Sequence, residues 1–206
     1  MLKQIGIGII LYFFWVITQK FLASDIKAEN QIIDRIHECY IVKNINEYLQ
    51  ENINVTKFHL MLTTLLIDVN VMYVIGMGIY TNRLDSLYMI ISGVILRQIC
   101  QYITRLPIPS GILWFDPGFP TLLMVYEAQN DFFFSGHTLI SLITGSNIFM
   151  NTSNIFIKLY AIIYVLYEIF FVIVTKSHYF MDVYAGITTF FMLTYMFEKI
   201  NNYLNY

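Results

Sequence analysis

The sequence predicts an all-α, polytopic membrane protein that forms one domain. Of its 206 residues, 57% are hydrophobic and only 13% are charged, and the mean hydropathy is +0.61. Soluble proteins carry about 25% charged residues. The 17 Phe and 16 Tyr residues are of the kind that gather at membrane interfaces. A net charge of -2 gives no electrostatic basis for binding nucleic acid.

The N-terminal part of the chain contributes an apolar stretch and then a mixed one. Residues 4–23 are predicted to form a retained helix rather than a signal peptide, because the apolar run is long and no A-x-A cleavage site follows it. Residues 24–57 alternate acidic, basic and apolar side chains at roughly helical spacing. We expect this segment to form one or two amphipathic helices that lie on the bilayer. Two membrane spans follow, at 58–80 and 84–106.

Residues 107–134 interrupt the series of spans. Pro107, Pro109 and Gly111 end the preceding helix and predict an ordered loop. Three more spans complete a prediction of six transmembrane helices, at 135–151, 155–175 and 179–198. With this count, the end of the third helix, the start of the fourth and the junction of the fifth and sixth lie on one side of the membrane. The polar clusters of the sequence therefore meet at one face, as a single active site requires.

Two of these clusters each place a histidine at the edge of an apolar segment. The first reads DFFFSGHT over 131–138, and the second reads KSHYFMD over 176–182. On a helix, Asp182 lies one turn from His178 on the same face, so its carboxylate can orient the ring and make it a better nucleophile or base. An aspartate inside an apolar segment is costly and tends to be functional. We therefore interpret this pair as catalytic rather than structural.

His137 follows Ser135 and Gly136 at the predicted start of a helix, where free amide groups and the helix dipole favour a phosphate. Gly136 lets the backbone approach the ligand closely, and Ser135 or Thr138 can donate a hydrogen bond. His137 then suits a general acid for a departing alcohol and a base for an incoming one. The alternative is an ordinary helix cap with a histidine at the membrane interface.

Three cations are candidates for holding a phosphate. Arg97 and Arg105 lie eight positions apart, so they share a helix face about two turns apart. Arginine binds phosphate in a planar fork. Lys176 is the third candidate, although both it and Arg105 can equally extend to the membrane interface without a ligand.

At these residues the chain resembles the sphingomyelin synthase family, within the type 2 phosphatidic acid phosphatase superfamily. Asp131-x-x-x-Ser135-Gly136-His137-Thr138 is similar to the family motif C-G-D-x-x-x-S-G-H-T, with Gln129 and Asn130 in place of its first two residues. The stretch 178–182 resembles the family motif H-Y-x-x-D. Arg97, Tyr102 and the Leu106-Pro107-Ile108-Pro109 run resemble a third family element, with Ser110 inserted before Gly111. The similarity covers residues 97–186.

The resemblance implies a catalytic triad of His137, His178 and Asp182, with no metal and no cofactor. It implies transfer of phosphocholine or phosphoethanolamine from phosphatidylcholine or phosphatidylethanolamine to ceramide, which releases diacylglycerol. The transfer is expected to pass through a phosphohistidine at His178. Four further residues are expected to position the head group: Asp131, Glu127, Tyr102 and Tyr179. The loop acids can hold an ammonium group by charge and, with aromatic rings, by cation–π contact, or can simply be solvated.

Three other functions stay open at this point. Water in place of ceramide gives a lipid phosphatase or a phospholipase C with the same triad. Diacylglycerol as the acceptor gives a transferase between glycerolipids. A membrane scaffold or transporter is disfavoured because the sequence shows neither broken helices nor inverted repeats. A homo-oligomer is also left open by the sequence.

Two observations disagree on which side of the membrane holds the site. The Lys and Arg residues on the predicted site side outnumber those on the other side: Lys20, Lys27, Arg35, Lys43, Lys57, Arg97, Arg105 and Lys176 against Lys3, Arg83, Lys158 and Lys199. The positive-inside rule then places the site in the cytosol. The resemblance implies an exoplasmic or lumenal site, in the Golgi, the ER or the plasma membrane. We favour the latter, because several of the eight are phosphate candidates or are balanced by acids.

Overall fold

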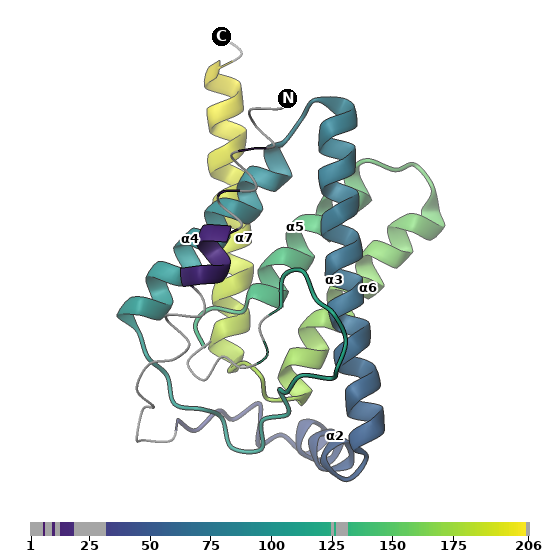
Figure 1. Cartoon of the computed structure of the whole chain (residues 1–206), viewed down its shortest axis with the longest axis vertical. Coiled ribbons are helices and arrows are strands. Elements are labelled where there is room, and N and C mark those ends of the chain that lie inside the picture. The colour runs from purple at the N-terminus through teal and green to yellow at the C-terminus, as the bar shows by residue number, and fades with distance from the viewer. Residues whose placement is uncertain are drawn as a thin grey trace.

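The computed structural model of the chain describes residues 6, 10, 13–18, 32–124, 126 and 132–204. Over these residues the chain is helical and contains no strand. The long helices run in the order α2 (Tyr40–Glu51), α3 (Ile53–Thr81), α4 (Asp85–Ile103), α5 (Gly136–Met150), α6 (Ile155–Val174) and α7 (Phe180–Leu204). Figure 1 shows α3 to α7 as a bundle, with α2 lying across one end of it.

Four of these helices are long and apolar enough to cross a membrane, namely α3, α4, α6 and α7. They correspond to four of the six predicted spans. The helix α5 has 15 residues and measures about 22 Å, which is less than the roughly 30 Å of a hydrocarbon core. The helix matches the predicted segment 135–151 within one residue at each end, but it is not among the helices long enough to cross a membrane. Most of the predicted span 4–23 lies outside the described residues, so six spans are not confirmed.

The helix α2 is the amphipathic part of the predicted segment 24–57. Its buried residues Val42, Asn46 and Leu49 recur every three or four positions and so form one face. The segment ends earlier than predicted, because α3 begins at Ile53 rather than at residue 58. Within the first turn of α3, the Thr56 hydroxyl donates a hydrogen bond of 2.6 Å to the Leu49 carbonyl. This bond fixes the corner between α2 and α3 next to the bundle.

The short helix α5 lies at the centre of the bundle and contacts α3, α4, α6 and α7. Two glycines allow this close packing. A Cβ atom on Gly93 of α4 would lie 2.4 Å from Leu139 Cδ2, and one on Gly145 of α5 would lie 2.4 Å from Val165 Cγ2. Small residues commonly allow such close approach of helices in membrane proteins. The core around α5 is formed by Ile67, Val71, Met89, Ile90, Phe134, Leu139, Ile140, Ile143, Tyr164 and Leu193.

The connection between α4 and α5 folds back along α3, as Figure 1 shows in teal and green. The Asp68 carboxylate of α3 accepts a hydrogen bond of 2.9 Å from the Leu122 amide. Further along, the Tyr126 hydroxyl contacts the Thr64 hydroxyl and donates to the Leu60 carbonyl at 3.3 Å. Non-helical backbone needs such partners wherever water is scarce. The loop is thus fixed to α3 and brings its side chains to one wall of a cavity.

Candidate active site

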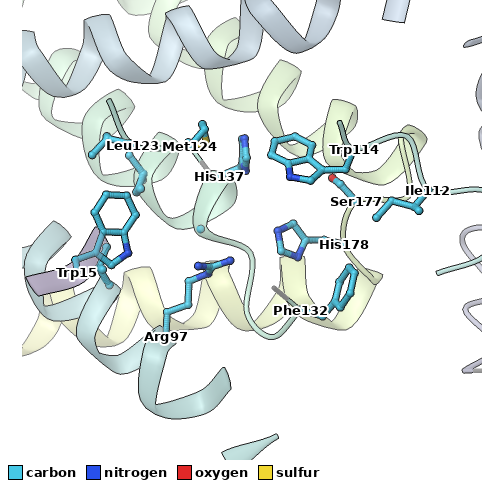
Figure 2. Close-up of a pocket in the computed structure, with 13 residues that line it drawn as sticks. Trp15, Arg97, Ile112, Trp114, Leu123, Met124, Phe132, His137, Ser177 and His178 are labelled. Atoms are coloured by element: carbon cyan, nitrogen blue, oxygen red, sulfur yellow. The ribbon is translucent and has the colours of Figure 1, made fainter. Parts of the chain in front are cut away.

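The two histidine clusters of the sequence meet where α5 begins and α6 passes into α7. The Ser135 amide donates a hydrogen bond of 3.0 Å to the Asp182 carbonyl, which joins the two clusters directly. Beside this junction lies a cavity of about 50 Å³. Figure 2 shows the Arg97 guanidinium and the rings of His137 and His178 around this space. Its remaining walls are Trp15, Val94, Ile112, Trp114, Leu123, Met124, Phe132, Gly136, Ile140 and Ser177.

His178 and Asp182 form the contact that their spacing predicts. The His178 Nδ1 atom lies 3.4 Å from Asp182 Oδ2, and the same oxygen accepts a hydrogen bond of 3.0 Å from the Tyr179 amide. Asp182 is fully buried in the first turn of α7, and His178 is buried just before it. A carboxylate on Nδ1 orients the ring and stabilises a positive charge on it. The Nε2 atom is then the one available for chemistry at the cavity.

The His137 ring lies across the cavity from His178, with the two ring centroids 6.5 Å apart. His137 is buried in the first turn of α5, and its Nε2 atom has no hydrogen-bond partner among the described residues. The ring meets the edge of Trp114 at a centroid distance of 5.0 Å. A buried ring nitrogen without a partner is costly, and a ligand in the cavity would supply one.

Arg97 brings a buried positive charge from α4 to the start of α5. Its Nε atom donates a hydrogen bond of 2.7 Å to the Phe134 carbonyl. The guanidinium lies against Gly136, where a Cβ atom would be 3.3 Å from Nε and 3.5 Å from Cζ. Gly136 therefore leaves the space in which Arg97 reaches the cavity. The guanidinium and the helix N-terminus both favour an anion at this position.

Ser135 and Thr138 cap α5 rather than face the cavity. The Ser135 Oγ atom accepts hydrogen bonds from the Thr138 amide at 3.3 Å and from the Thr138 hydroxyl at 3.0 Å. Both residues are fully buried, and neither lines the cavity. Gly186 of α7 packs against this cap, since a Cβ atom there would lie 3.0 Å from the Ser135 carbonyl oxygen. The predicted role of these hydroxyls in binding a phosphate thus has no support in the geometry, which gives them a structural role.

The end of α6 positions Lys176, Ser177 and His178 in turn. The Lys176 amide donates to the Ile173 carbonyl and the Ser177 amide to the Val172 carbonyl, both at 3.1 Å. This is a Schellman ending, with Lys176 at a φ of 52°. Glycine is the usual residue there because a side chain is strained. Lys176 is buried next to the cavity without lining it.

Tyr179 ties the proline-rich run to the second histidine cluster. Its hydroxyl donates a hydrogen bond of 2.9 Å to the Pro107 carbonyl. Burial raises the pKa of Tyr179 to about 12, helped by the charges of Asp182 and Asp34. The phenol therefore stays protonated and keeps this bond at neutral pH. Tyr179 therefore joins two backbone segments beside the site and does not line the cavity.

The arrangement suits the transfer of a phosphoryl group. One imidazole with a carboxylate behind it can attack phosphorus, the opposite imidazole can exchange a proton with an alcohol, and an arginine with a helix N-terminus can hold the phosphate. Within the described part of the chain, no group of three or more His, Cys, Asp and Glu side chains is placed to hold a metal ion.

Comparison with known families agrees with this chemistry. The family model AtPDCT1/2 matches residues 37–199, which include both histidine clusters and Arg97. The chain belongs to the AtPDCT1/2 family. AtPDCT denotes phosphatidylcholine:diacylglycerol cholinephosphotransferase, a lipid head-group transferase. Neither a curated protein nor a solved structure matches the chain.

The AtPDCT1/2 match does not name sphingomyelin synthases, so that resemblance stays a prediction. Two more of the predicted site residues do not line the cavity. Tyr102, predicted from the resemblance, is 68% exposed on α4, and Arg105, predicted from its spacing to Arg97, is exposed just after α4. Glu127 and Asp131 lie outside the described residues. The structure therefore gives no support to Tyr102 as a head-group contact.

Three residues that bond to the backbone around the site were not predicted from the sequence. All three come from segment 24–57, for which only an amphipathic helix was predicted. Asn46 of α2 donates hydrogen bonds to the Gly111 carbonyl at 3.1 Å and to the Val174 carbonyl at 2.8 Å. Asp34 and His37 contact the backbone around His178. The sequence feature that could have indicated them is an aspartate and a histidine three positions apart, on the side of the membrane predicted to hold the site. The AtPDCT1/2 match begins at this histidine.

Proposed function

We propose that the protein transfers phosphocholine from phosphatidylcholine to the free hydroxyl of a diacylglycerol. The observation that carries this proposal is the pair of buried imidazoles, His137 and His178, facing one cavity beside the Arg97 guanidinium. Membership of the AtPDCT1/2 family supports a lipid head-group transferase and favours diacylglycerol as the acceptor. The resemblance to sphingomyelin synthases favours ceramide, which is therefore the second candidate acceptor.

In the first half of the reaction, Arg97 and the N-terminus of α5 hold the donor phosphate. The His178 Nε2 atom attacks phosphorus, and the bond from phosphorus to the glycerol oxygen breaks. His137 gives a proton to that oxygen, so diacylglycerol leaves as a neutral alcohol. Asp182 stabilises the positive charge that develops on the His178 ring. Phosphocholine then remains bound to His178 through a phosphorus–nitrogen bond.

In the second half, a new alcohol takes the place of the first. His137, now neutral, removes the proton from the acceptor hydroxyl, and the oxygen attacks phosphorus as the bond to His178 Nε2 breaks. The product is a phosphatidylcholine with the acceptor's acyl chains, or sphingomyelin if ceramide is the acceptor. Each half reverses the other, so every group returns to its starting protonation state.

The test uses the purified protein in liposomes that contain phosphatidylcholine labelled in its phosphocholine group. Separate arms add a diacylglycerol with distinct acyl chains, ceramide, or neither. Labelled phosphatidylcholine with the new acyl chains supports the proposal, and it should be absent with His178→Ala. Labelled sphingomyelin would instead make ceramide the acceptor. Free phosphocholine in all arms would show a hydrolase, and no product from a folded protein would overturn the assignment.

We further propose that the site faces the exoplasmic or lumenal side, following the family resemblance at the two histidine clusters. The count of positive residues opposes this placement. Among the described residues, four helices are long and apolar enough to hold the chain in a membrane in either orientation.

A further inference from the structure

A short segment before α2 lies against the backbone that carries His178. It spans residues 32–39 and forms turns rather than a regular helix. In the sequence it precedes the second histidine cluster by about 140 residues, since His37 and His178 are 141 positions apart. The segment lines no part of the cavity, yet two of its side chains are directed at residues 178–180.

Asp34 is bonded to the start of α7. Its Oδ2 atom accepts a hydrogen bond of 2.6 Å from the amide of Phe180, the first residue of that helix. The first amides of a helix have no partner within the helix and need one from outside. The other carboxylate oxygen, Oδ1, accepts a bond of 2.9 Å from the Ile36 amide, which fixes the turn. The Asp34 side chain is only 9% exposed, although the bond itself lies at the surface, where Phe180 is 41% exposed.

His37 is bonded to the catalytic histidine itself. Its Nε2 atom lies 3.0 Å from the His178 carbonyl oxygen, and its ring stacks on Tyr179 with centroids 5.8 Å apart and planes at 22°. A carbonyl oxygen can only accept, so Nε2 must carry the hydrogen. The same atom lies 4.0 Å from Asp34 Oδ2. His37 is buried, and the contact is not one that solvent would replace easily.

These contacts restrain the two peptide units that follow the residue that carries the nucleophile, 178–179 and 179–180. The amide of Tyr179 is held by Asp182, the amide of Phe180 by Asp34 and the carbonyl of His178 by His37. Without the last two, this backbone would lose its bonds to the segment before α2 and would be held by Asp182, by the end of α6 and by the bond from Tyr179 to Pro107. The distance from its ring to a phosphate on Arg97 depends on that backbone, and an error of about 1 Å in such a distance can cost about 100-fold in rate.

We propose that Asp34 and His37 are positioning residues for His178, which set the place of its ring relative to His137 and to the phosphate of the donor. They act through the backbone of residues 178–180 and do not touch the substrate. The inference rests on the proposed transfer reaction for its kinetic test, and on the contacts alone for its second test.

The kinetic test compares three substitutions of His37 in the liposome assay. His37→Ala removes the bond and should lower kcat by about 10- to 100-fold, with KM for phosphatidylcholine changed much less. His37→Phe keeps a ring against Tyr179 but cannot donate, so it should lose as much as alanine does. His37→Gln places an amide nitrogen near the position of Nε2 and should recover most of the loss. Asp34→Ala should lower kcat in the same way.

His59→Ala is the matched control, because His59 is also a histidine held between helices, bonded at 2.8 Å to the Tyr167 hydroxyl. It should stay within about threefold of wild type if only the contacts near His178 matter. An equal loss in the alanine and glutamine variants of His37, an effect on KM alone, or an equal loss in His59→Ala would overturn the proposal.

The second test does not depend on transfer. The chain has only four histidines, so in protein labelled at the histidine rings each NMR signal can be assigned by single substitution. His37→Ala and His37→Phe should shift or broaden the signal of His178, while His59→Ala should leave it unchanged. An unmoved His178 signal in folded His37→Ala would contradict the proposal. Wild-type protein without transfer activity but with this NMR response would contradict the proposed function alone.

Discussion

Gly136 shows how a single hydrogen atom in place of a side chain shapes the site. The guanidinium of Arg97 lies where a Cβ atom of residue 136 would meet it at 3.3 Å. Arg97 is buried and its Nε is already bonded to the Phe134 carbonyl, so it has little freedom to give way. A methyl group at this position would displace the charge that the proposed reaction needs.

We expect Gly136→Ala to lower kcat/KM for head-group transfer by about 10- to 100-fold, because the added methyl group displaces the buried Arg97 guanidinium. Tm should not rise, since Gly136 is the first residue of α5 and the preference for alanine over glycine belongs to helix interiors. The control is Gly76→Ala in α3, where an added Cβ atom meets nothing within 4 Å. A Gly136→Ala enzyme with full activity would mean that the position of Arg97 is not critical.

Lys176 has a backbone conformation that a lysine adopts at a cost, and this makes its role testable. Its φ of 52° favours glycine by about 1 kcal/mol. Lys176→Gly should therefore raise Tm by about 2–4 °C. If the ammonium group also attracts the donor phosphate, the same variant should lose about 10-fold in kcat/KM, an ordinary effect for one charged contact. Kinetics and thermal unfolding are measured on the same preparation.

Asn82 provides the comparison for Lys176. It ends α3 at a φ of 55°, in the turn between α3 and α4, far along the chain from both histidine clusters. Asn82→Gly should relieve similar backbone strain without a change in activity. If Lys176→Gly behaves in the same way, Lys176 is a strained structural residue and not a phosphate ligand.

At the scale of the elements, the apolar helices could be predicted from the sequence, whereas the contacts between segments distant in the chain could not. Long apolar runs predict α3, α4, α6 and α7, and the spacing of His178 and Asp182 predicts their contact on α7. The contact of His37 with His178 joins segments 141 positions apart, and no local pattern encodes it. The bounds of α5 were predicted within one residue at each end, because Ser135 and Asn151 mark its limits in the sequence as they do in the structure.

The contacts between segment 32–39 and the start of α7 should make the stability of the folded protein depend on pH. Burial lowers the pKa of His37 below its ordinary 6.5; Lys176 also lowers it, while Asp34, the His178 carbonyl and Asp182 oppose the shift. The unfolded chain then binds a proton more readily than the folded protein. Stability should be highest above about pH 6.5 and should fall as the pH drops below that value.

Thermal unfolding in detergent between pH 7.5 and 5 would check this expectation. His37→Gln cannot titrate, so its Tm should fall less over that range than the Tm of wild type. The difference between the two curves isolates His37 from the other titrating groups. Parallel curves would show that the proton on His37 is not linked to folding.

At the scale of the whole molecule, chemical labelling of one exposed thiol can show on which side of the membrane the site lies. Cys39 is exposed and directly precedes α2, at the same end of the bundle as His178. Cys100 is less exposed and lies in α4. A Cys100→Ser protein therefore reports the location of the site end through Cys39 alone.

If the site is exoplasmic or lumenal, a membrane-impermeant maleimide should label Cys39 in the Cys100→Ser protein from the outside of intact cells or from the lumenal side of opened microsomes. Labelling only from the cytosolic side would support the positive-inside count instead. The Cys39→Ser, Cys100→Ser double variant sets the background. Labelling of the detergent-solubilised protein is the positive control, because no membrane then separates the maleimide from Cys39.

The size of the cavity has a consequence for the lifetime of a phosphorylated enzyme. A space of about 50 Å³ holds a few water molecules, and a phosphocholine bound to His178 would displace most of them. Hydrolysis would then be rare, and the intermediate would persist until an alcohol arrived by diffusion in the plane of the bilayer. The ratio of transfer to hydrolysis should therefore rise with the mole fraction of acceptor lipid in the membrane. In a membrane poor in diacylglycerol, the enzyme would stay in the form that carries phosphocholine on His178.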